Sequence, residues 1–301
     1  MRVQLYKSQN ALSTLVNEML NALDISSNTK KEYRRGVKVF LHYIKSNGFN
    51  KNSYLEYKRF LGGKINYTVS TKNKYLVAAK LFLRELCKQG LISNDITINI
   101  KSFKQSKLHK KVGINETEML SINRYLNTLD NSFTSNRTKA MFSLLIFQGL
   151  RQIEVARLNV EDFDLKNKRA FIQGKGATDK EAVYLHPISQ KIIAAYLSQI
   201  KRNNGALFFS TSNNSINKRI TTKTVQTTVK SVLNKLSINK SVHGFRHFFT
   251  TQLIKSYKGN LVTVAKYTRH KSLEMLTVYN DSILRKRDLK RYYKVFDGIK
   301  L

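Results

Sequence analysis

Apolar residues recur at helical spacing through the first third of the chain, from about residue 7 to residue 99. In segment 30–44 they form one stripe made of Tyr33, Val37, Phe40, Leu41 and Ile44. Segment 71–89 repeats the pattern with Tyr75, Ala79, Phe82, Leu83 and Leu86. Residues at this spacing lie along one side of an α-helix. The pattern predicts a helical domain, and Asn28 and Thr29 are expected to cap the first of these two helices.

Basic residues lie off both stripes. They are Lys30, Lys31, Arg34, Arg35 and Lys38 in the first segment and Lys80, Arg84 and Lys88 in the second. The 301 residues include 54 Lys and Arg against 19 Asp and Glu, and a net charge of +35 would be self-repelling unless a polyanion neutralised it. Helices with basic faces can bind a DNA duplex through its phosphates, so these residues are candidate DNA contacts. A solvated charged surface would give the same local pattern, and it is the global charge that favours nucleic acid.

An anionic membrane surface is the other polyanion that such a charge could meet. The basic residues are spread through predicted helices, and we find no long apolar run, signal peptide or lipidation motif. Cys87 is the single cysteine, so no disulfide framework can form within the chain, which fits a reducing cytosol. It lies on an apolar helix face, where we expect it to pack. We therefore expect a cytoplasmic protein with no membrane partner.

Segment 101–113 has no apolar periodicity and contains five lysines. This composition is typical of a basic linker, here between a domain at 1–100 and a second domain at 114–301. A long linker would allow two domains to bind opposite faces of a duplex. Its lysines would follow the phosphate backbone between them, and the candidate contacts are Lys104, Lys107 and Lys110.

The second domain mixes two periodicities. Helical patterns are expected at 115–129, 136–148, 188–200, 222–236, 244–257 and 261–268. Between them, segments 164–173 and 182–185 resemble short strands on either side of a Gly174–Lys175–Gly176 turn. The predicted fold class is therefore mainly α with a small β-sheet, as a helical N-terminal domain followed by an α+β domain.

Four short segments of this second domain carry residues suited to phosphate chemistry. They are 149–154 (Gly-Leu-Arg-Gln-Ile-Glu), 174–176 (Gly-Lys-Gly), 243–247 (His-Gly-Phe-Arg-His), and His270 followed by Tyr279. Breaking a phosphodiester requires a nucleophile in line, cations on the non-bridging oxygens and an acid for the departing oxygen. A guanidinium meets two phosphate oxygens and stays charged, so Arg151 and Arg246 are candidates for the second task.

Each of these residues also has a plainer interpretation. Arg151 could form a structural ion pair with Glu154, and Lys175 could be an ordinary exposed hairpin lysine. His243 and His247 are spaced as a metal pair, but no third ligand completes a site convincingly. Tyr279 is one of 15 tyrosines, and His270 alone could be a cap. The specificity lies in the order and combination of the segments.

In that order and approximate spacing, the sequence resembles the tyrosine recombinases, the family of phage integrases and Xer-type recombinases, over roughly 115–295. The first arginine box of the family corresponds to 149–158, its hairpin lysine to Lys175, and its His-x-x-Arg box to 243–247. Its final histidine and tyrosine correspond to His270 and Tyr279. The family usually has Leu-Gly before the last histidine, where this chain has Thr268 and Arg269. The N-terminal helices are similar to the core-binding (SAM-like) domain of the family.

The resemblance implies a role for each motif residue. Tyr279 would attack the scissile phosphate and leave a 3′-phosphotyrosyl bond and a free 5′-hydroxyl. Arg151 and Arg246 would bind the non-bridging oxygens, and His270 would donate a further hydrogen bond. His243 would act as the base, Lys175 would protonate the 5′-oxygen, and Glu154 would orient the site. The covalent bond conserves the energy of the phosphodiester, so no cofactor and no metal is expected.

The resemblance also implies an assembly. A homotetramer would exchange strands between two duplexes through a Holliday junction, at short inverted-repeat core sites and with room for accessory DNA-bending proteins. The tail from about 283 would pack into a neighbouring protomer, through the apolar residues Leu289, Tyr293, Val295 and Phe296. The alternative is a tail folded onto its own domain. Resolution of dimers or cointegrates and integration of a mobile element both stay open. Two other functions stay open as well: a type IB-like topoisomerase, and an architectural DNA-binding protein with an inactive catalytic set.

Overall fold

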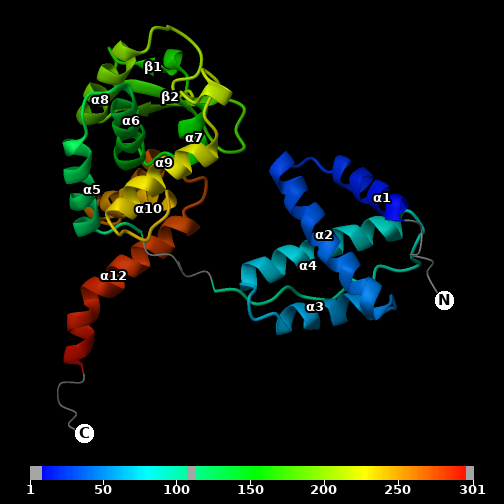
Figure 1. Cartoon of the computed structure of the whole chain (residues 1–301). Helices are drawn as coiled ribbons and strands as arrows, with labels where there is room; N and C mark the ends of the chain where they lie inside the picture. The colour runs from blue at the N-terminus through cyan, green and yellow to red at the C-terminus, as the bar shows by residue number, and fades with distance from the viewer. Residues whose placement is uncertain (1–8, 107–112, 296–301) are drawn as a thin grey trace. The chain divides into compact units, whose positions relative to one another are not determined.

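The computed structural model describes residues 9–106 and 113–295. Contacts divide the chain into two units, 1–107 and 108–301 (Figure 1). No helix in the described part of the chain combines the length and apolar character needed to cross a membrane.

The first unit consists of helices only. They are α1 (Gln9–Asn21), α2 (Ser27–Asn47), α3 (Ser53–Gly63) and α4 (Val69–Lys88). Helices α2 and α4 approach closely at Gly36, where an added Cβ would lie 2.6 Å from the Cβ of Ala78. The predicted stripes become the core, since Val37, Phe40 and Phe82 are buried together there and Cys87 packs against them. The helical periodicity predicted from the sequence is therefore confirmed.

The N-terminus of α2 differs from the prediction. Its cap is Ser26, whose side-chain oxygen accepts the backbone N–H of Thr29 at 3.3 Å. Asn28 and Thr29 already lie inside the helix, so the prediction that they cap it was wrong. Ser26 and Thr29 are both strong capping residues, and local propensity alone does not separate neighbouring candidates.

The start of the predicted linker packs on the first unit. The backbone N–H of Phe103 donates to Asn73 Oδ1 at 2.8 Å, and Asn73 Nδ2 donates back to the carbonyl of Phe103 at 3.0 Å. The ring of Phe103 also lies 5.5 Å from Lys58 Nζ. The chain thus stays packed on the first unit as far as Phe103, and Lys104 is exposed just beyond it.

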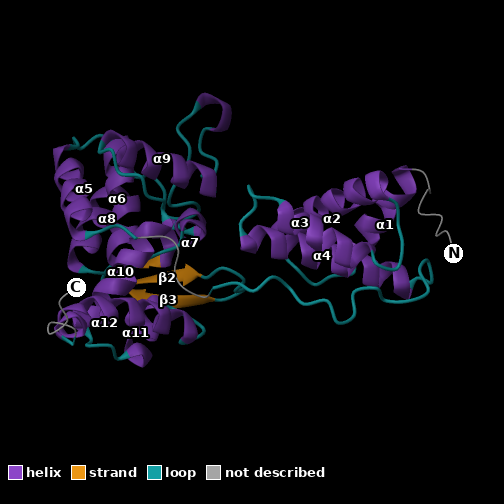
Figure 2. Cartoon of the chain, turned by 90° about the horizontal axis from the view of Figure 1, so that it is seen from below, coloured by secondary structure: helices purple, strands orange, loops and turns teal. Residues whose placement is uncertain are grey.

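The second unit is mainly helical with one small sheet (Figure 2). Its helices are α5 (Glu116–Thr128), α6 (Phe133–Phe147), α7 (Gln152–Arg157), α8 (Pro187–Gln199), α9 (Thr222–Lys235), α10 (His243–Ser256), α11 (Leu261–Thr268) and α12 (Glu274–Lys294), with short 3-10 turns at Val160–Asp162 and Asn213–Ser215. Its strands are β1 (Phe163–Asp164), β2 (Arg169–Gln173) and β3 (Lys180–Tyr184), in the order β1-β2-β3 and antiparallel throughout. The predicted mixture of helices with a small sheet is confirmed.

Helix α6 is the centre of this unit. It packs against α8 and α10, and Met141, Phe142, Leu144 and Leu145 are all fully buried. Phe142 meets Phe245 of α10 edge to face, with ring centroids 5.4 Å apart. The C-terminus of α6 is thereby fixed beside the N-terminus of α10, where the two arginine segments of the sequence meet.

Candidate active site

The first part of the site is the turn between α6 and α7. Gly149 has a φ of +58°, and an added Cβ would lie 2.2 Å from the ring of Phe249, so only glycine fits here. Arg151 follows as the residue that caps α7. Its backbone N–H donates to Glu154 Oε2 and its Nη1 donates to Glu154 Oε1, both at 2.8 Å. Glu154 therefore fixes both the backbone and the side chain of Arg151.

Glu154 is fully buried and carries two guanidinium partners. Besides Arg151, it accepts a hydrogen bond from Nη2 of Arg269 at 2.9 Å. Burial alone would raise the pKa of Glu154, but Arg269 and the hydrogen bonds from Arg151 outweigh it and hold the pKa below its usual value. The ion pair between Arg151 and Glu154 considered from the sequence is present. Arg151 nevertheless lines the open cleft, so the ion pair does not prevent it from meeting a ligand.

Arg246 is the most deeply buried cation of the described residues, with an exposed fraction of 2%. It lies in the first turn of α10, where Nη1 donates to the carbonyl of Gly149 at 2.8 Å and Nη2 donates to the carbonyl of Thr268. No carboxylate in the described ranges pairs directly with it. Burial, and then the charges of Arg151 and Arg269, lower the pKa of Arg246 to about 10, which still leaves it charged at neutral pH. A buried cation held by two neutral carbonyls suits an anionic ligand.

His270 lies just after α11 beside these arginines. Its Nδ1 is 2.6 Å from Thr268 Oγ1, and the Thr268 hydroxyl in turn donates to the carbonyl of Val264 at 2.9 Å. Burial, then Arg246 and Arg151, lower the pKa of His270 to about 4. The imidazole is therefore neutral at pH 7 before any phosphate is bound.

Tyr279 lies on the second turn of α12 and is buried. Its ring centroid is 5.0 Å from that of His247, which is 4.8 Å from the ring centroid of His243. Burial raises the pKa of Tyr279 to about 12, although the charge of Arg246 acts in the opposite direction. The phenol is thus protonated at neutral pH and needs a base to become a nucleophile. In the described residues, no group of three or more His, Cys, Asp and Glu is arranged to hold a metal.

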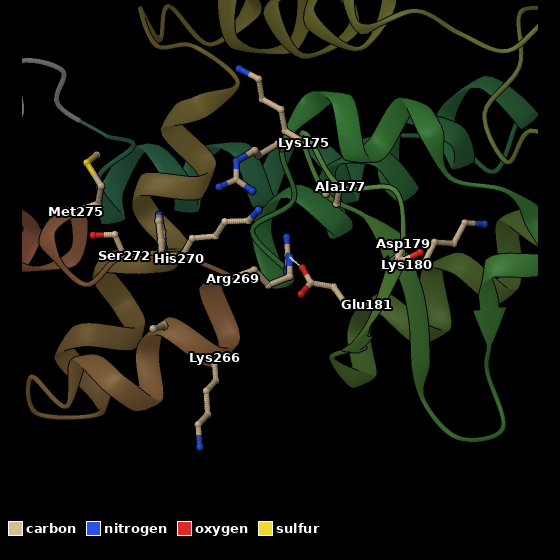
Figure 3. Close-up of a pocket in the computed structure, with 14 residues that line it drawn as sticks. Lys175, Ala177, Asp179, Lys180, Glu181, Lys266, Arg269, His270, Ser272 and Met275 are labelled. Atoms are coloured by element: carbon tan, nitrogen blue, oxygen red, sulfur yellow. Dashed lines mark ion pairs between the residues drawn. The ribbon is translucent and has the colours of Figure 1, made fainter. Parts of the chain in front are cut away.

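Lys175 is exposed in the turn of the β2–β3 hairpin. The carbonyl of Gly174 beside it accepts a hydrogen bond from Nη1 of Arg157, on α7, at 3.2 Å. Lys175 lines one open cleft of about 710 Å³ together with Arg151, Arg269 and His270 (Figure 3). Figure 3 shows its side chain extending away from Arg269. The structure therefore brings all the predicted catalytic residues to one region, with Arg246 buried at its centre and Lys175 at its rim.

Two residues of this site did not emerge from the sequence as functional. Arg269 and Thr268 appeared there only as departures from the usual Leu-Gly. In the structure the side chain of Arg269 is 6% exposed and contacts Glu154, while Thr268 contacts both Arg246 and His270. The available signal was the position next to His270, since nothing in the local sequence pattern distinguishes Arg269 from the many other basic residues of the chain.

Nine of the predicted DNA contacts lie in the described part of the first unit. Lys31, Arg35, Lys38, Arg84, Lys88 and Lys104 are exposed, and Lys30, Arg34 and Lys80 are partly exposed. Two of the arginines have partners inside the unit: Arg84 Nε pairs with Asp95 at 3.1 Å, and Arg34 donates to Asn17 at 3.0 Å. Lys107 and Lys110 lie outside the described residues.

Comparison with known proteins agrees with this geometry. Residues 114–284 match the model of the phage integrase family. Tyrosine recombinase XerD of Oceanobacillus iheyensis is 28% identical over 291 residues, which cover 90% of this chain and 93% of that protein. Among solved structures, the XerH site-specific recombinase bound to a palindromic difH substrate shares the fold with a TM-score of 0.72 and 19% identity, over 95% of this chain and 85% of that one.

A lambda integrase dimer bound to a core site also shares the fold, with a TM-score of 0.67 and 14% identity over 90% of this chain and 94% of that one. The family model covers more than half of the chain and includes every residue of the site. The chain therefore belongs to the phage integrase family and is a tyrosine recombinase, an enzyme of site-specific recombination that cleaves and rejoins DNA.

Proposed function

We propose that the cleft lined by Arg151, Lys175 and His270 is the cleavage site and that Tyr279 is its nucleophile. The observation that carries this proposal is the meeting of Arg151, Arg246, His270 and Tyr279 from four separate elements. Arg246 is buried and lacks a direct carboxylate partner in the described chain, while Arg151 is held by Glu154 at the edge of the open cleft. A phosphodiester bound there would meet two fixed guanidinium groups.

In the proposed step, the phenol oxygen of Tyr279 attacks phosphorus and the bond from phosphorus to the 5′-oxygen breaks. The product is a 3′-phosphotyrosyl bond and a free 5′-hydroxyl. Arg151 and Arg246 bind the non-bridging oxygens, and His270 donates a hydrogen bond to one of them. The attack requires loss of the phenol proton, since burial raises the pKa of Tyr279 to about 12.

His243 and Lys175 are assigned the two proton transfers. His243 takes the phenol proton, which is supported by its place at the start of α10 and its proximity to Tyr279 through His247. Lys175 gives a proton to the 5′-oxygen, which is supported by its place on the rim of the cleft that Arg151 also lines. Rejoining reverses the sequence with a 5′-hydroxyl from the partner duplex.

Binding of DNA is assigned to both units. The residues up to about 100 act as the core-binding domain, and the exposed Lys31, Arg35 and Lys38 of α2 contact phosphates. The chain beyond about 101 joins it to the catalytic domain from 114, so that the two domains bind a duplex together at inverted-repeat core sites. The net charge of +35 supports binding of DNA by the chain.

The C-terminal part of α12 is assigned to assembly. Leu289 and Tyr293 are 41% and 59% exposed, and Val295 just after the helix is 70% exposed, so this segment presents apolar side chains to solvent. Figure 1 shows this part of α12 extending away from the body of its own unit. Packing of this tail on a neighbouring protomer would link four subunits on two duplexes through a Holliday junction. Phe296 lies outside the described residues.

The proposed biological role is resolution of dimers or cointegrates, or integration of a mobile element, at the nucleoid of a prokaryotic cell. Both roles use site-specific recombination, which the family model and the Xer tyrosine recombinases among the relatives support. Accessory DNA-bending proteins belong to the same proposal.

A nicked suicide substrate tests the cleavage site. DNA from either side of the gene is placed in a substrate that loses a short 5′-hydroxyl fragment on cleavage, so that the covalent product accumulates. The unmutated protein is expected to give a slower-migrating species on a denaturing gel, and Tyr279→Phe is expected to give none. Both proteins should bind the duplex equally in a native gel.

Binding by both proteins with no covalent species on any candidate site would contradict the proposal and favour an architectural protein. A covalent species with Tyr279→Phe would show that another residue is the nucleophile. Relaxation of supercoils without exchange between two marked sites would identify a topoisomerase.

A further inference from the structure

Arg269 adopts a backbone conformation that arginine normally avoids. It ends α11 with φ +55° and ψ +44°, the left-handed region, and its N–H donates to the carbonyl of Ala265. Glycine is the ordinary residue at such a helix end, because a Cβ there is unfavourable. An arginine at this position is therefore expected to make side-chain contacts that offset the cost of the backbone.

The side chain of Arg269 contacts three other elements. Its Nη2 donates to Glu154 Oε2 on α7 at 2.9 Å, and its Nη1 donates to the carbonyl of Gln148 at the end of α6 at 3.4 Å. Its Nε lies 3.1 Å from Glu181 Oε1 on β3, the contact drawn as a dashed line in Figure 3. We call the ion pairs of Arg269 with Glu154 and Glu181 the Arg269 bridge.

Glu181 connects the bridge to the hairpin that carries Lys175. It lies in β3 opposite Ile172 of β2, one residue beyond the pair of Gln173 and Lys180 that closes the hairpin. The ion pair therefore joins the base of this turn to a side chain that is almost completely buried. The side chain of Glu181 is 53% exposed, so this ion pair contributes little to stability, and its role here is to fix the position of the hairpin.

We propose that Arg269 is a positioning residue that couples the two cation-bearing sides of the cleft. Through Glu154 it fixes the guanidinium of Arg151, and through Glu181 it holds the β2–β3 hairpin so that Lys175 reaches the 5′-oxygen. Arg269 also directly precedes His270. One side chain thus sets the position of Lys175, which protonates the leaving group, relative to Arg151, which binds the phosphate.

This inference rests on the proposed role of Lys175, and the two can be tested apart. A substrate with sulfur in place of the bridging 5′-oxygen supplies a thiolate leaving group. A thiol has a pKa near 8.5, far below that of an alcohol, so it departs without a proton donor. Variants that impair only protonation therefore recover on this substrate, whereas variants with a general structural defect do not.

The experiment measures single-turnover cleavage of both substrates by Lys175→Ala, Glu181→Gln and Arg269→Gly. On the oxygen substrate we expect Lys175→Ala to be slower by about 10²- to 10⁴-fold, as for loss of a general acid. Glu181→Gln should be slower by about fivefold and Arg269→Gly by about 100-fold, as for misplaced catalytic groups. Asp164→Asn is the matched control, since it breaks an ion pair with Arg169 at the other end of the same sheet.

On the sulfur substrate, Lys175→Ala and Glu181→Gln should return to within about twofold of the unmutated protein, because their defect is bypassed. Arg269→Gly should recover only in part, since Arg151 also loses its support. Arg269→Lys keeps the charge but replaces the planar guanidinium by a single ammonium, which cannot reach Glu154 and Glu181 together. Its cleavage rate should therefore be reduced, as in Glu181→Gln or Arg269→Gly, and should not equal that of the unmutated protein.

Unchanged cleavage by Glu181→Gln and Arg269→Gly, with Lys175→Ala recovered on sulfur, would overturn the inference and leave the role of Lys175 intact. Failure of Lys175→Ala to recover on sulfur would instead contradict the proposed function of Lys175. Equal loss on both substrates by Glu181→Gln would show a general structural defect and would also overturn the inference.

Discussion

At the scale of single residues, the site contains three arginines that differ in their partners. Arg151 and Arg269 share the carboxylate of Glu154, whereas Arg246 is held by carbonyls. Burial, and then the neighbouring positive charges, lower the pKa of His270 and keep it neutral. The phosphate of the proposed substrate would bring a negative charge to these cations, and its binding should change the protonation of the residues around it.

His270 provides the first prediction. In the free protein its pKa is about 4, against 6.5 for an unperturbed imidazole, so the unfolded chain takes up this proton before the folded one does. His270 therefore leaves the free energy of unfolding unchanged above pH 6.5 and lowers it progressively as the pH falls from 6.5 toward 4. A bound phosphate favours the charged ring and should raise its pKa.

Proton NMR of the imidazole checks this. The His270 signal, assigned by its loss in His270→Asn, should not titrate between pH 5.5 and 8 in free Tyr279→Phe protein, and should titrate at higher pH with DNA bound. An ordinary titration near pH 6.5 in the free protein would contradict the burial and charge effects described here.

Thr268 provides the second prediction. Valine has the same shape but cannot hydrogen-bond to Nδ1 of His270, so Thr268→Val should lower the cleavage rate by roughly tenfold through a misplaced ring. Thr277→Val is the control, because that hydroxyl lies on an exposed turn of α12 and bonds only to the carbonyl of Leu273. Equal rates for the two variants, measured on the suicide substrate, would show that Thr268 does not orient His270.

At the scale of elements, the site depends on the short connections between helices. Gly149 joins α6 to α7 in a left-handed conformation, directly against the ring of Phe249. We predict that Gly149→Ala destabilises the catalytic unit by about 2–4 kcal/mol, since backbone strain and overpacking add.

Gly205→Ala is the matched control, because Gly205 has a similar φ of +83° and nothing within 4 Å of an added Cβ. It should cost only about 1 kcal/mol. Urea denaturation of both variants measures the difference. Equal destabilisation would mean that Phe249 moves aside without cost and that the close approach is not a constraint.

The elements themselves were largely predictable. Helices α9 and α11 and the hairpin around Lys175 lie within a few residues of their predicted bounds, because periodicity and glycine turns are local signals. The contacts of the site are not local. Arg246 reaches a carbonyl 97 residues away and Arg269 a carboxylate 115 residues away. The motif residues could be selected by their chemistry, whereas Arg269 and Thr268 required the fold.

At the scale of the whole molecule, charge should govern binding. Each cation that binds a phosphate contributes about 0.9 to the slope of log affinity against log salt, because it releases a counterion from the DNA. Replacing the exposed Lys31, Arg35 and Lys38 by glutamine in one triple variant should therefore reduce the magnitude of this slope by about 2–3. Lys166→Gln, an exposed lysine on the β1–β2 turn, should leave it nearly unchanged.

Fluorescence anisotropy with labelled duplex at several salt concentrations measures these slopes. A triple variant with the slope of the unmutated protein would place the DNA contacts elsewhere on the chain and would leave the basic face of α2 as a solvated surface.

Tyr279 is one of 15 tyrosines in the chain, and mass spectrometry of the covalent product identifies which of them carries the DNA. The adduct formed on the suicide substrate is digested with nuclease and protease, and the peptide that retains a nucleotide is sequenced. We predict a single modified peptide with the 3′-phosphate on Tyr279. A nucleotide on any other tyrosine, such as the exposed Tyr267, would contradict the assignment of the nucleophile and with it the geometry proposed for cleavage.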